Sequence, residues 1–178
     1  MPAPRIDYPE GMQAATLVPV EEYLRTNYDP DRDYVDGRIV ERNLGEKSHS
    51  RIQRKLITHL DRNANDTKIE VLPEQRVQVS PTRFRVPDVI VLKLPQPDEA
   101  VVSSPPFICI EILSPDDSME DMQERIEDCL RFGVPHVWII SPRHRKAYVA
   151  SSSGIAEAAG ALGTKDPQID VPISALFE

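Results

Sequence analysis

Cysteine is scarce in this chain, and its two copies form no recognisable site. Cys109 and Cys129 lie inside apolar segments and make no CxxC motif. A disulfide framework needs more cysteines than this, and a thiolate zinc site needs closely spaced pairs. The sequence therefore excludes both, and we predict that the two cysteines are core residues.

Long apolar runs are also missing. No stretch approaches the roughly 20 consecutive apolar residues of a membrane helix. The N-terminal residues 1–5, MPAPR, lack the apolar core of a signal peptide. We therefore expect a cytoplasmic protein that does not contact a membrane.

Positive charge is in deficit, with 21 Lys and Arg against 29 Asp and Glu and a net charge of −8. This balance argues against nucleic-acid binding, because affinity for phosphates depends on clustered Lys and Arg. Local clusters nevertheless exist, at Arg51, Arg54 and Lys55, at Arg83 and Arg85, and at Arg143, His144, Arg145 and Lys146. Such clusters can simply be solvated faces, so composition leaves a nucleic-acid function open.

What is present is ordinary globular composition, 40% hydrophobic and 28% charged. The length of 178 residues suits one core. We predict a single domain over residues 16–178. Residues 1–15 carry three prolines without periodicity and are predicted to form an N-terminal arm.

Helix and strand patterns alternate along the chain. Residues 16–28 predict a short helix, and the Asp-Gly turn within residues 34–40 predicts a β-hairpin. Apolar residues at helical spacing predict a core-facing helix over residues 45–61, with Ser48 as its N-cap. Strands are predicted over 69–72, 76–79, 85–92, 107–113, 136–140 and 146–150, a helix from about Ser118, a loop over 151–163, and a strand with a short helix over 169–177. The order indicates an α/β (α+β) fold, a mixed sheet flanked by helices.

Glu111 is the most informative residue, because the strand around it, residues 107–113, is otherwise entirely apolar. Such a continuous pattern is typical of a strand buried on both faces. An unpaired buried carboxylate costs several kcal/mol, so Glu111 must be protonated, paired with a cation or bound to a metal. A salt bridge to an arginine and a metal site are both open.

A second acid, Asp88, follows Pro87 and opens the apolar segment of residues 89–92. By itself, Asp88 could be part of a turn. The sequence distance to Glu111 allows one strand, a connection and the start of a neighbouring strand. Adjacent strands lie about 4.8 Å apart, so the two carboxylates could share one cation.

With these two acids, the chain resembles a large bacterial family of putative restriction endonucleases with the PD-(D/E)xK nuclease fold. The matching segments are YVDGRIV at 34–40, His49, RVPDV at 85–89, EILSP at 111–115 and GVPHVWI at 133–139. These segments occur in the expected order and extend over nearly the whole chain. The resemblance implies a restriction-endonuclease-like mixed β-sheet flanked by helices, with an N-terminal helix and β-hairpin.

The resemblance also implies a site. It implies that Asp88 and Glu111 are metal ligands for Mg²⁺ or Mn²⁺, and that His49 and Glu46 face the site from the first core helix. It implies DNA as the substrate and a homodimer as the assembly. From the residues alone, His49 is equally well interpreted as a partly buried structural histidine.

One departure from the family pattern concerns the lysine two residues after the second acid, which is Leu113 here. The resemblance suggests that this lysine has moved to the following helix, where the matching position is Arg125. At about 100° per residue, Arg125 lies on the border of that helix's apolar stripe, so it can face a cleft. Arginine stays charged, so it could stabilise a phosphorane but could not take a proton from water.

Three hypotheses follow. The first is a Mg²⁺- or Mn²⁺-dependent deoxyribonuclease in which Asp88 and Glu111 hold the metal. Its expected catalytic residues are Asp88, Glu111, Arg125, His49 and Glu46. The second is a nuclease-fold protein without turnover that binds nucleic acid or a protein partner, which Arg125 and the charge of −8 favour. The third is a structural or interaction domain in which Glu111 pairs with Arg85 or Arg125.

Overall fold

The structure is a computed structural model that describes residues 17–42, 46–62 and 64–178. The predicted arm, residues 1–15, lies outside the described residues. The helices are α1 Val20–Arg25, α2 Lys47–Asp61, α3 Ala64–Thr67, α4 Met119–Phe132 and α5 Ile173–Phe177. The strands are β1 Asp33–Val35, β2 Arg38–Val40, β3 Ile69–Pro73, β4 Val77–Ser80, β5 Arg83–Arg85, β6 Val89–Lys93, β7 Ile108–Ile112, β8 His136–Ser141, β9 Lys146–Ser151, β10 Gly154–Glu157, β11 Ala161–Lys165 and β12 Gln168–Pro172.

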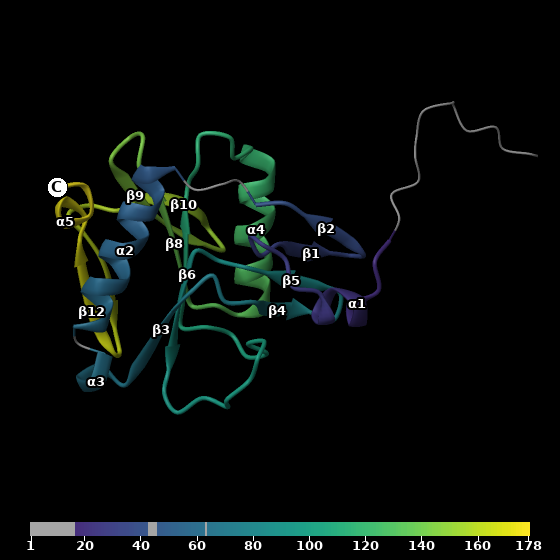
Figure 1. Cartoon of the computed structure of the whole chain (residues 1–178). Coiled ribbons are helices and arrows are strands. Elements are labelled where there is room, and N and C mark those ends of the chain that lie inside the picture. The colour runs from purple at the N-terminus through teal and green to yellow at the C-terminus, as the bar shows by residue number, and fades with distance from the viewer. Residues whose placement is uncertain (1–16, 43–45, 63) are drawn as a thin grey trace, which may run out of the picture.

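The central element is a six-stranded mixed sheet in the order β10-β9-β8-β7-β6-β3. Within it, β7 and β8 are parallel and the other neighbours are antiparallel. Parallel strands require a crossover connection, and here α4 supplies it. Figure 1 shows α2 and α4 on opposite sides of this sheet.

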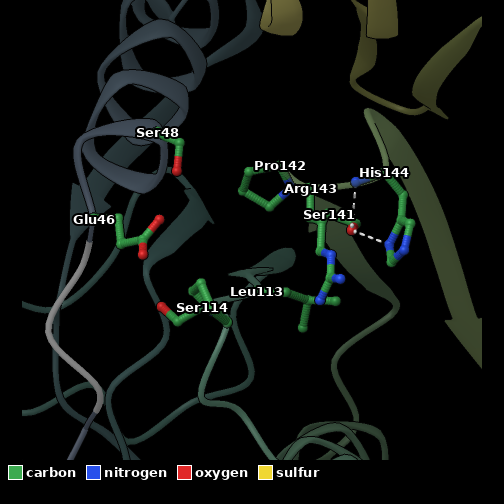
Figure 2. Close-up of a pocket in the computed structure, with 9 residues that line it drawn as sticks. Glu46, Ser48, Leu113, Ser114, Ser141, Pro142, Arg143 and His144 are labelled. Carbon is green, nitrogen blue, oxygen red and sulfur yellow. Dashed lines mark hydrogen bonds between the residues drawn. The ribbon is translucent and has the colours of Figure 1, made fainter.

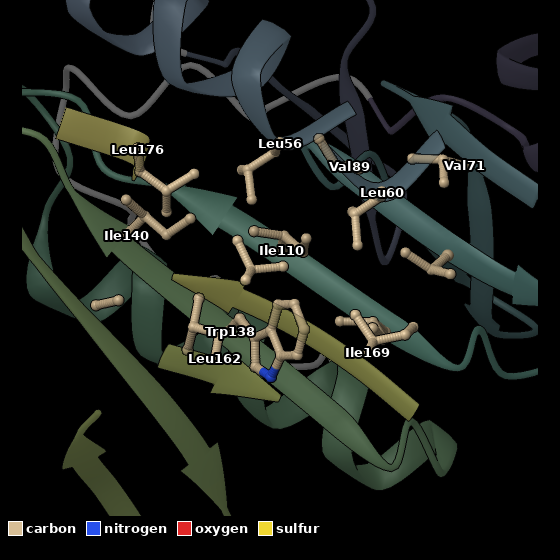
Figure 3. Packing of buried hydrophobic residues seen from close by; sticks show 14 of the residues in the cluster. Leu56, Leu60, Val71, Val89, Ile110, Trp138, Ile140, Leu162, Ile169 and Leu176 are labelled. Atoms are coloured by element: carbon tan, nitrogen blue, oxygen red, sulfur yellow. The ribbon is translucent and has the colours of Figure 1, made fainter. Parts of the chain in front are cut away.

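Each face of the central sheet carries its own apolar cluster. On the α2 side, Ile52, Leu56 and Leu60 of the helix pack with Ile110 and Trp138 of the strands (Figure 3). The other face packs against α4, and the two clusters alternate along β6 and β7. Burial on both faces explains why these strands are almost continuously apolar in sequence. The cysteines behave as predicted, since Cys109 and Cys129 are buried and unbonded in the α4 cluster.

The two core helices begin and end differently. Ser118 caps α4, because its hydroxyl accepts a hydrogen bond from the Asp121 amide at 3.0 Å. Gly133 ends the helix at φ 102°, a left-handed conformation that suits glycine. The prediction for α2 was wrong at its first turn, because Ser48 lies inside the helix and Glu46 holds the N-cap position without a side-chain bond.

A second, four-stranded sheet has the order β2-β1-β5-β4. The predicted hairpin is confirmed, and Asp36 and Gly37 turn it with φ values of 49° and 90°. Tyr23 of α1 packs against Tyr34 and Phe84 of this sheet. The aromatic cluster therefore fixes the short N-terminal helix on the second sheet.

A buried ion network ties the second sheet to α4. Arg85 donates to Asp33 at 3.0 Å and to Asp128 at 2.8 Å, and all three residues are buried. Arg83 reaches Asp128 at 3.1 Å from the exposed side. The predicted basic pair Arg83 and Arg85 is therefore neutralised by carboxylates.

Two segment predictions were wrong. The predicted loop at residues 151–163 contains β10 and the start of β11, and β11 pairs with β12 in a separate two-stranded sheet. All four residues of β10 are exposed, so that strand has no apolar alternation to reveal it. The predicted strand 85–92 is interrupted at Val86, Pro87 and Asp88 between β5 and β6.

None of the helices in the described part of the chain has the length and apolar character that a membrane crossing requires. A single domain over residues 16–178 stays a prediction.

Candidate active site at the ends of two central strands

Strand register brings the two predicted acids together. Strands β6 and β7 are antiparallel, and Val89 lies opposite Ile110. Extending this register by one residue places Asp88 opposite Glu111, because 88 + 111 equals 89 + 110. Directly opposed residues of an antiparallel pair share one face of the sheet, with Cβ atoms about 5 Å apart. The two buried carboxylates therefore lie side by side.

Asp88 is surrounded by donors. Its Oδ1 accepts a hydrogen bond from Arg42 and lies 3.2 Å from Nε2 of His49, and its Oδ2 accepts from the Ile112 amide at 2.7 Å. Burial raises the pKa of Asp88, but these hydrogen bonds and the charge of Arg42 outweigh burial and lower it below its ordinary value. Asp88 is therefore held as a carboxylate.

His49 is buried in the first turn of α2, beside Asp88. Burial lowers its pKa, but the hydrogen bond with Asp88 and that residue's charge raise it overall. The imidazole therefore favours the protonated form in this pair. The structure places His49 where the family resemblance implied, in contact with the first acid.

The carboxylate of Glu111 has fewer hydrogen-bond donors around it than that of Asp88. The Glu111 side chain forms an ion pair in which Oε2 lies 3.4 Å from Nη1 of Arg125. Burial raises the pKa of Glu111 to about 7, with Asp88 adding repulsion, although Arg125 and Arg42 act in the opposite direction. Burial is therefore the main obstacle to ionisation of Glu111.

Arg125 reaches from α4 to two acids at once. Its Nη2 donates to Asp117 at 3.0 Å while Nη1 faces Glu111. The charge of Glu111 raises the pKa of Arg125, so the guanidinium stays protonated. Its Nε is buried and makes no hydrogen bond to any residue that the structure describes. Of the two partners considered for Glu111, Arg125 forms the pair and Arg85 does not.

Arg42 is the residue that sequence reasoning missed. It lies in the connection between β2 and α2, outside any periodic pattern, and pairs with Asp88, a carboxylate distant in the sequence. Burial lowers the pKa of Arg42, but the charges of Asp88 and Glu111 raise it overall. The sequence carried no local signal for this contact.

Glu46 is placed apart from the other predicted site residues. It is exposed just before α2 and lines a cavity of about 540 Å³ (Figure 2), and neither Asp88 nor Glu111 is among the residues that line this cavity. The structure therefore brings together Asp88, Glu111, Arg125 and His49, and leaves Glu46 at the rim.

The donor set can be compared with what a divalent cation requires. The described ranges contain no group of three or more His, Cys, Asp or Glu side chains placed to hold a metal. Mg²⁺ commonly uses only one or two carboxylates and completes its shell with water and substrate phosphate. Two buried carboxylates that lie side by side fit such a cation.

Replacing Glu111 with glutamine is expected to stabilise the metal-free protein at alkaline pH. With a folded-state pKa of about 7 against 4.5 unfolded, the contribution of Glu111 to stability is fully present below pH 4.5 and is lost as pH rises through 7. That loss amounts to about 3 kcal/mol. Urea unfolding in a chelator should therefore give equal stabilities near pH 4.5 and favour Glu111→Gln above pH 8. A less stable variant at pH 8 would show that the Arg125 ion pair dominates.

Comparison with a solved structure shows the fold. A putative nuclease from Anabaena variabilis ATCC 29413 superimposes with a TM-score of 0.76 at 22% identity, covering 88% of this chain and 96% of that one. The predicted fold is confirmed. The architecture is a restriction-endonuclease-like α/β fold.

The family follows from the sequence match. The model of the Uma2 family, described as putative restriction endonucleases, matches residues 20–166. The chain belongs to this family.

A cryo-EM structure of a DrdV–DNA complex matches with a TM-score of 0.37 and 13% identity, covering 71% of this chain and 12% of that chain. No curated protein matches the chain.

Proposed function

We propose that the protein is a Mg²⁺- or Mn²⁺-dependent nuclease that hydrolyses phosphodiester bonds in DNA. The observation that carries this proposal is the pair of buried carboxylates, with Asp88 immediately before β6 and Glu111 in the neighbouring strand β7. Membership of a family of putative restriction endonucleases supports the class of reaction. Asp88 and Glu111 would hold the cation together.

When bound, the cation supplies Lewis-acid chemistry, because it lowers the pKa of a coordinated water and offsets charge on the phosphate. The chain's own residues prepare the site for it. Asp88 is kept ionised by Arg42, His49 and the Ile112 amide. These contacts also fix its orientation, so that the carboxylate needs little reorganisation when substrate arrives.

Arg125 would serve as the cation for the phosphate. Its guanidinium stays charged and lies beside Glu111, and its Nε donor is unused by the described residues. A planar fork suits a phosphate that carries developing charge. Because Arg125 cannot release a proton near neutral pH, it would not act as a general base.

A second function is supported by a specific observation. Both acids are already ion-paired, Asp88 with Arg42 and Glu111 with Arg125. Arg125 also occupies the position where the family resemblance implies a lysine. A nuclease-fold protein that binds nucleic acid without turnover is therefore the alternative. A homodimer stays a prediction for either function.

Incubation with supercoiled plasmid, linear duplex and single-stranded DNA tests the proposal. We expect cleavage of at least one substrate with Mn²⁺ and none with a chelator. For the site variant Asp88→Asn, the matched control is Asp98→Asn, because Asp98 is exposed and lies outside the site. Specific DNA binding without cleavage under every metal condition would support the alternative.

Restoring lysine at position 125 is expected to raise Mn²⁺-dependent cleavage by about tenfold, because a desolvated lysine can take part in proton transfer, worth 10²–10⁴-fold when fully positioned. Initial cleavage rates of Arg125→Lys and the parent give the comparison, with Arg131→Lys on the exposed side of α4 as the control. Slower cleavage by Arg125→Lys would instead show that the planar guanidinium carries the role.

A further inference from the structure

The cavity that Glu46 lines belongs to the same sheet edge as the proposed site. Strands β7 and β8 are parallel, so both carboxyl ends meet there, and the Leu113 amide donates to the Ile140 carbonyl at 2.8 Å. The turn between β8 and β9 therefore lies next to the segment that follows Glu111. Figure 2 shows Arg143 and His144 of this turn on the opposite side of the cavity from Glu46 and Ser48, which lie at the start of α2.

The walls of the cavity combine apolar and polar groups. Its volume of about 540 Å³ is within the range of small-molecule sites. Leu113, Pro115 and Pro142 give apolar surface, and Ser48 and Ser114 give hydroxyls. This combination suits a sugar and a base rather than a purely ionic ligand.

The basic residues between β8 and β9, from Arg143 to Lys146, differ in whether their charges are paired. Lys146 pairs with Glu157 at 2.7 Å, and the guanidinium of Arg145 lies over the Phe177 ring. Arg143 makes no ion pair or hydrogen bond with any residue in the described ranges, whereas Arg42 and Arg125 of the proposed site are both paired. Arg143 is thus an exposed, uncompensated cation on the cavity wall.

The neighbouring histidine is oriented by its own turn. Ser141 is buried, and its hydroxyl lies 3.0 Å from Nδ1 of His144. The same hydroxyl accepts a hydrogen bond from the His144 amide at 3.3 Å. These contacts fix the imidazole beside Arg143 and leave its other ring nitrogen available to a ligand.

We propose that this cavity is a nucleotide-binding subsite, in which Arg143 contacts the phosphate next to the scissile one and the apolar wall receives the adjoining sugar and base. The inference rests on the proposed function for the identity of the ligand, a DNA strand. Glu46 on the opposite wall confines the phosphate to the Arg143 side. Arg143 is a positioning residue, since it reaches the substrate away from the reacting atoms.

The test measures DNA binding without metal, so its outcome is independent of cleavage. Fluorescence anisotropy with labelled single-stranded and duplex oligonucleotides, in a chelator and over a series of salt concentrations, compares the parent with Arg143→Gln. We expect binding to weaken by about fivefold to tenfold, and the slope of log K against log salt to fall by about 0.7–0.9, the value for one phosphate contact.

Arg145→Gln is the matched control, because it removes the same charge from the same turn outside the cavity. Its effect on affinity and slope should be clearly smaller, and the melting temperature of both variants should equal that of the parent. Equal effects of the two variants would overturn the subsite, as would an unchanged slope for Arg143→Gln. A mononucleotide that binds the parent as tightly as the oligonucleotide does would also overturn it, since a strand is the proposed ligand.

Discussion

Replacing Asp88 with asparagine is expected to lower Mn²⁺-dependent DNA cleavage by about a thousandfold or more. The substitution keeps the shape of the side chain and removes the negative charge of one of the two carboxylates that would hold the cation. Catalytic metals stabilise transition-state charge by several kcal/mol, and about 4 kcal/mol corresponds to a thousandfold in rate. Single-turnover cleavage of the best substrate gives the rate directly.

Stability provides the control for this variant. Asp88 accepts from Arg42 and from the Ile112 amide, so the melting temperature of Asp88→Asn must show that the fold persists. Asp98→Asn should cleave as the parent does. If Asp88→Asn keeps a tenth or more of the parent rate while folded, Asp88 is not a metal ligand and the proposed mechanism is wrong.

Removing the carboxylate of Asp128 is expected to destabilise the fold by about 3–5 kcal/mol, which is the usual cost of breaking a buried pair. Asp128→Ala leaves Arg85 buried with one fewer partner, because Arg85 Nε donates to Asp128 at 2.8 Å. The same change loosens the attachment of α4 to the second sheet. Urea unfolding of the metal-free protein measures the loss.

Glu127→Gln is the matched control on the same helix. Its carboxylate is half-exposed and pairs with Arg131 at 3.9 Å, so the expected change is within about 0.5 kcal/mol. A loss of less than 1 kcal/mol in Asp128→Ala would show that the network contributes little to stability.

The central sheet could be predicted because its strands are buried. Residues 89–92 and 107–113 are apolar on both faces, so any carboxylate among them stands out, and Glu111 was found in this way. The antiparallel register of β6 and β7 then brings Asp88 opposite it. The predicted α/β arrangement is confirmed for the same reason, since core helices and strands carry clear apolar periodicity.

Contacts between distant charged residues could not be predicted. Arg42 reaches Asp88 from an irregular connection. Arg85 in β5 bonds both Asp33 in β1 and Asp128 in α4. Charged residues have no periodicity that marks their partners, and only the tertiary arrangement selects them. Strand β10 was missed for a related reason, because a fully exposed edge strand has no buried face to pattern its sequence.

In the proposed mechanism Asp88 and Glu111 together hold one divalent cation. A Mn²⁺ titration followed by electron paramagnetic resonance of the free ion, with melting curves in parallel, tests for this site. We expect the parent to bind one ion and to gain RT ln(1 + [L]/Kd), about 2.7 kcal/mol at a hundred times Kd. Asp88→Asn and Glu111→Gln should each lose both the binding and the stabilisation. Unchanged Mn²⁺ binding in the two variants, or no binding by the parent, would contradict the account.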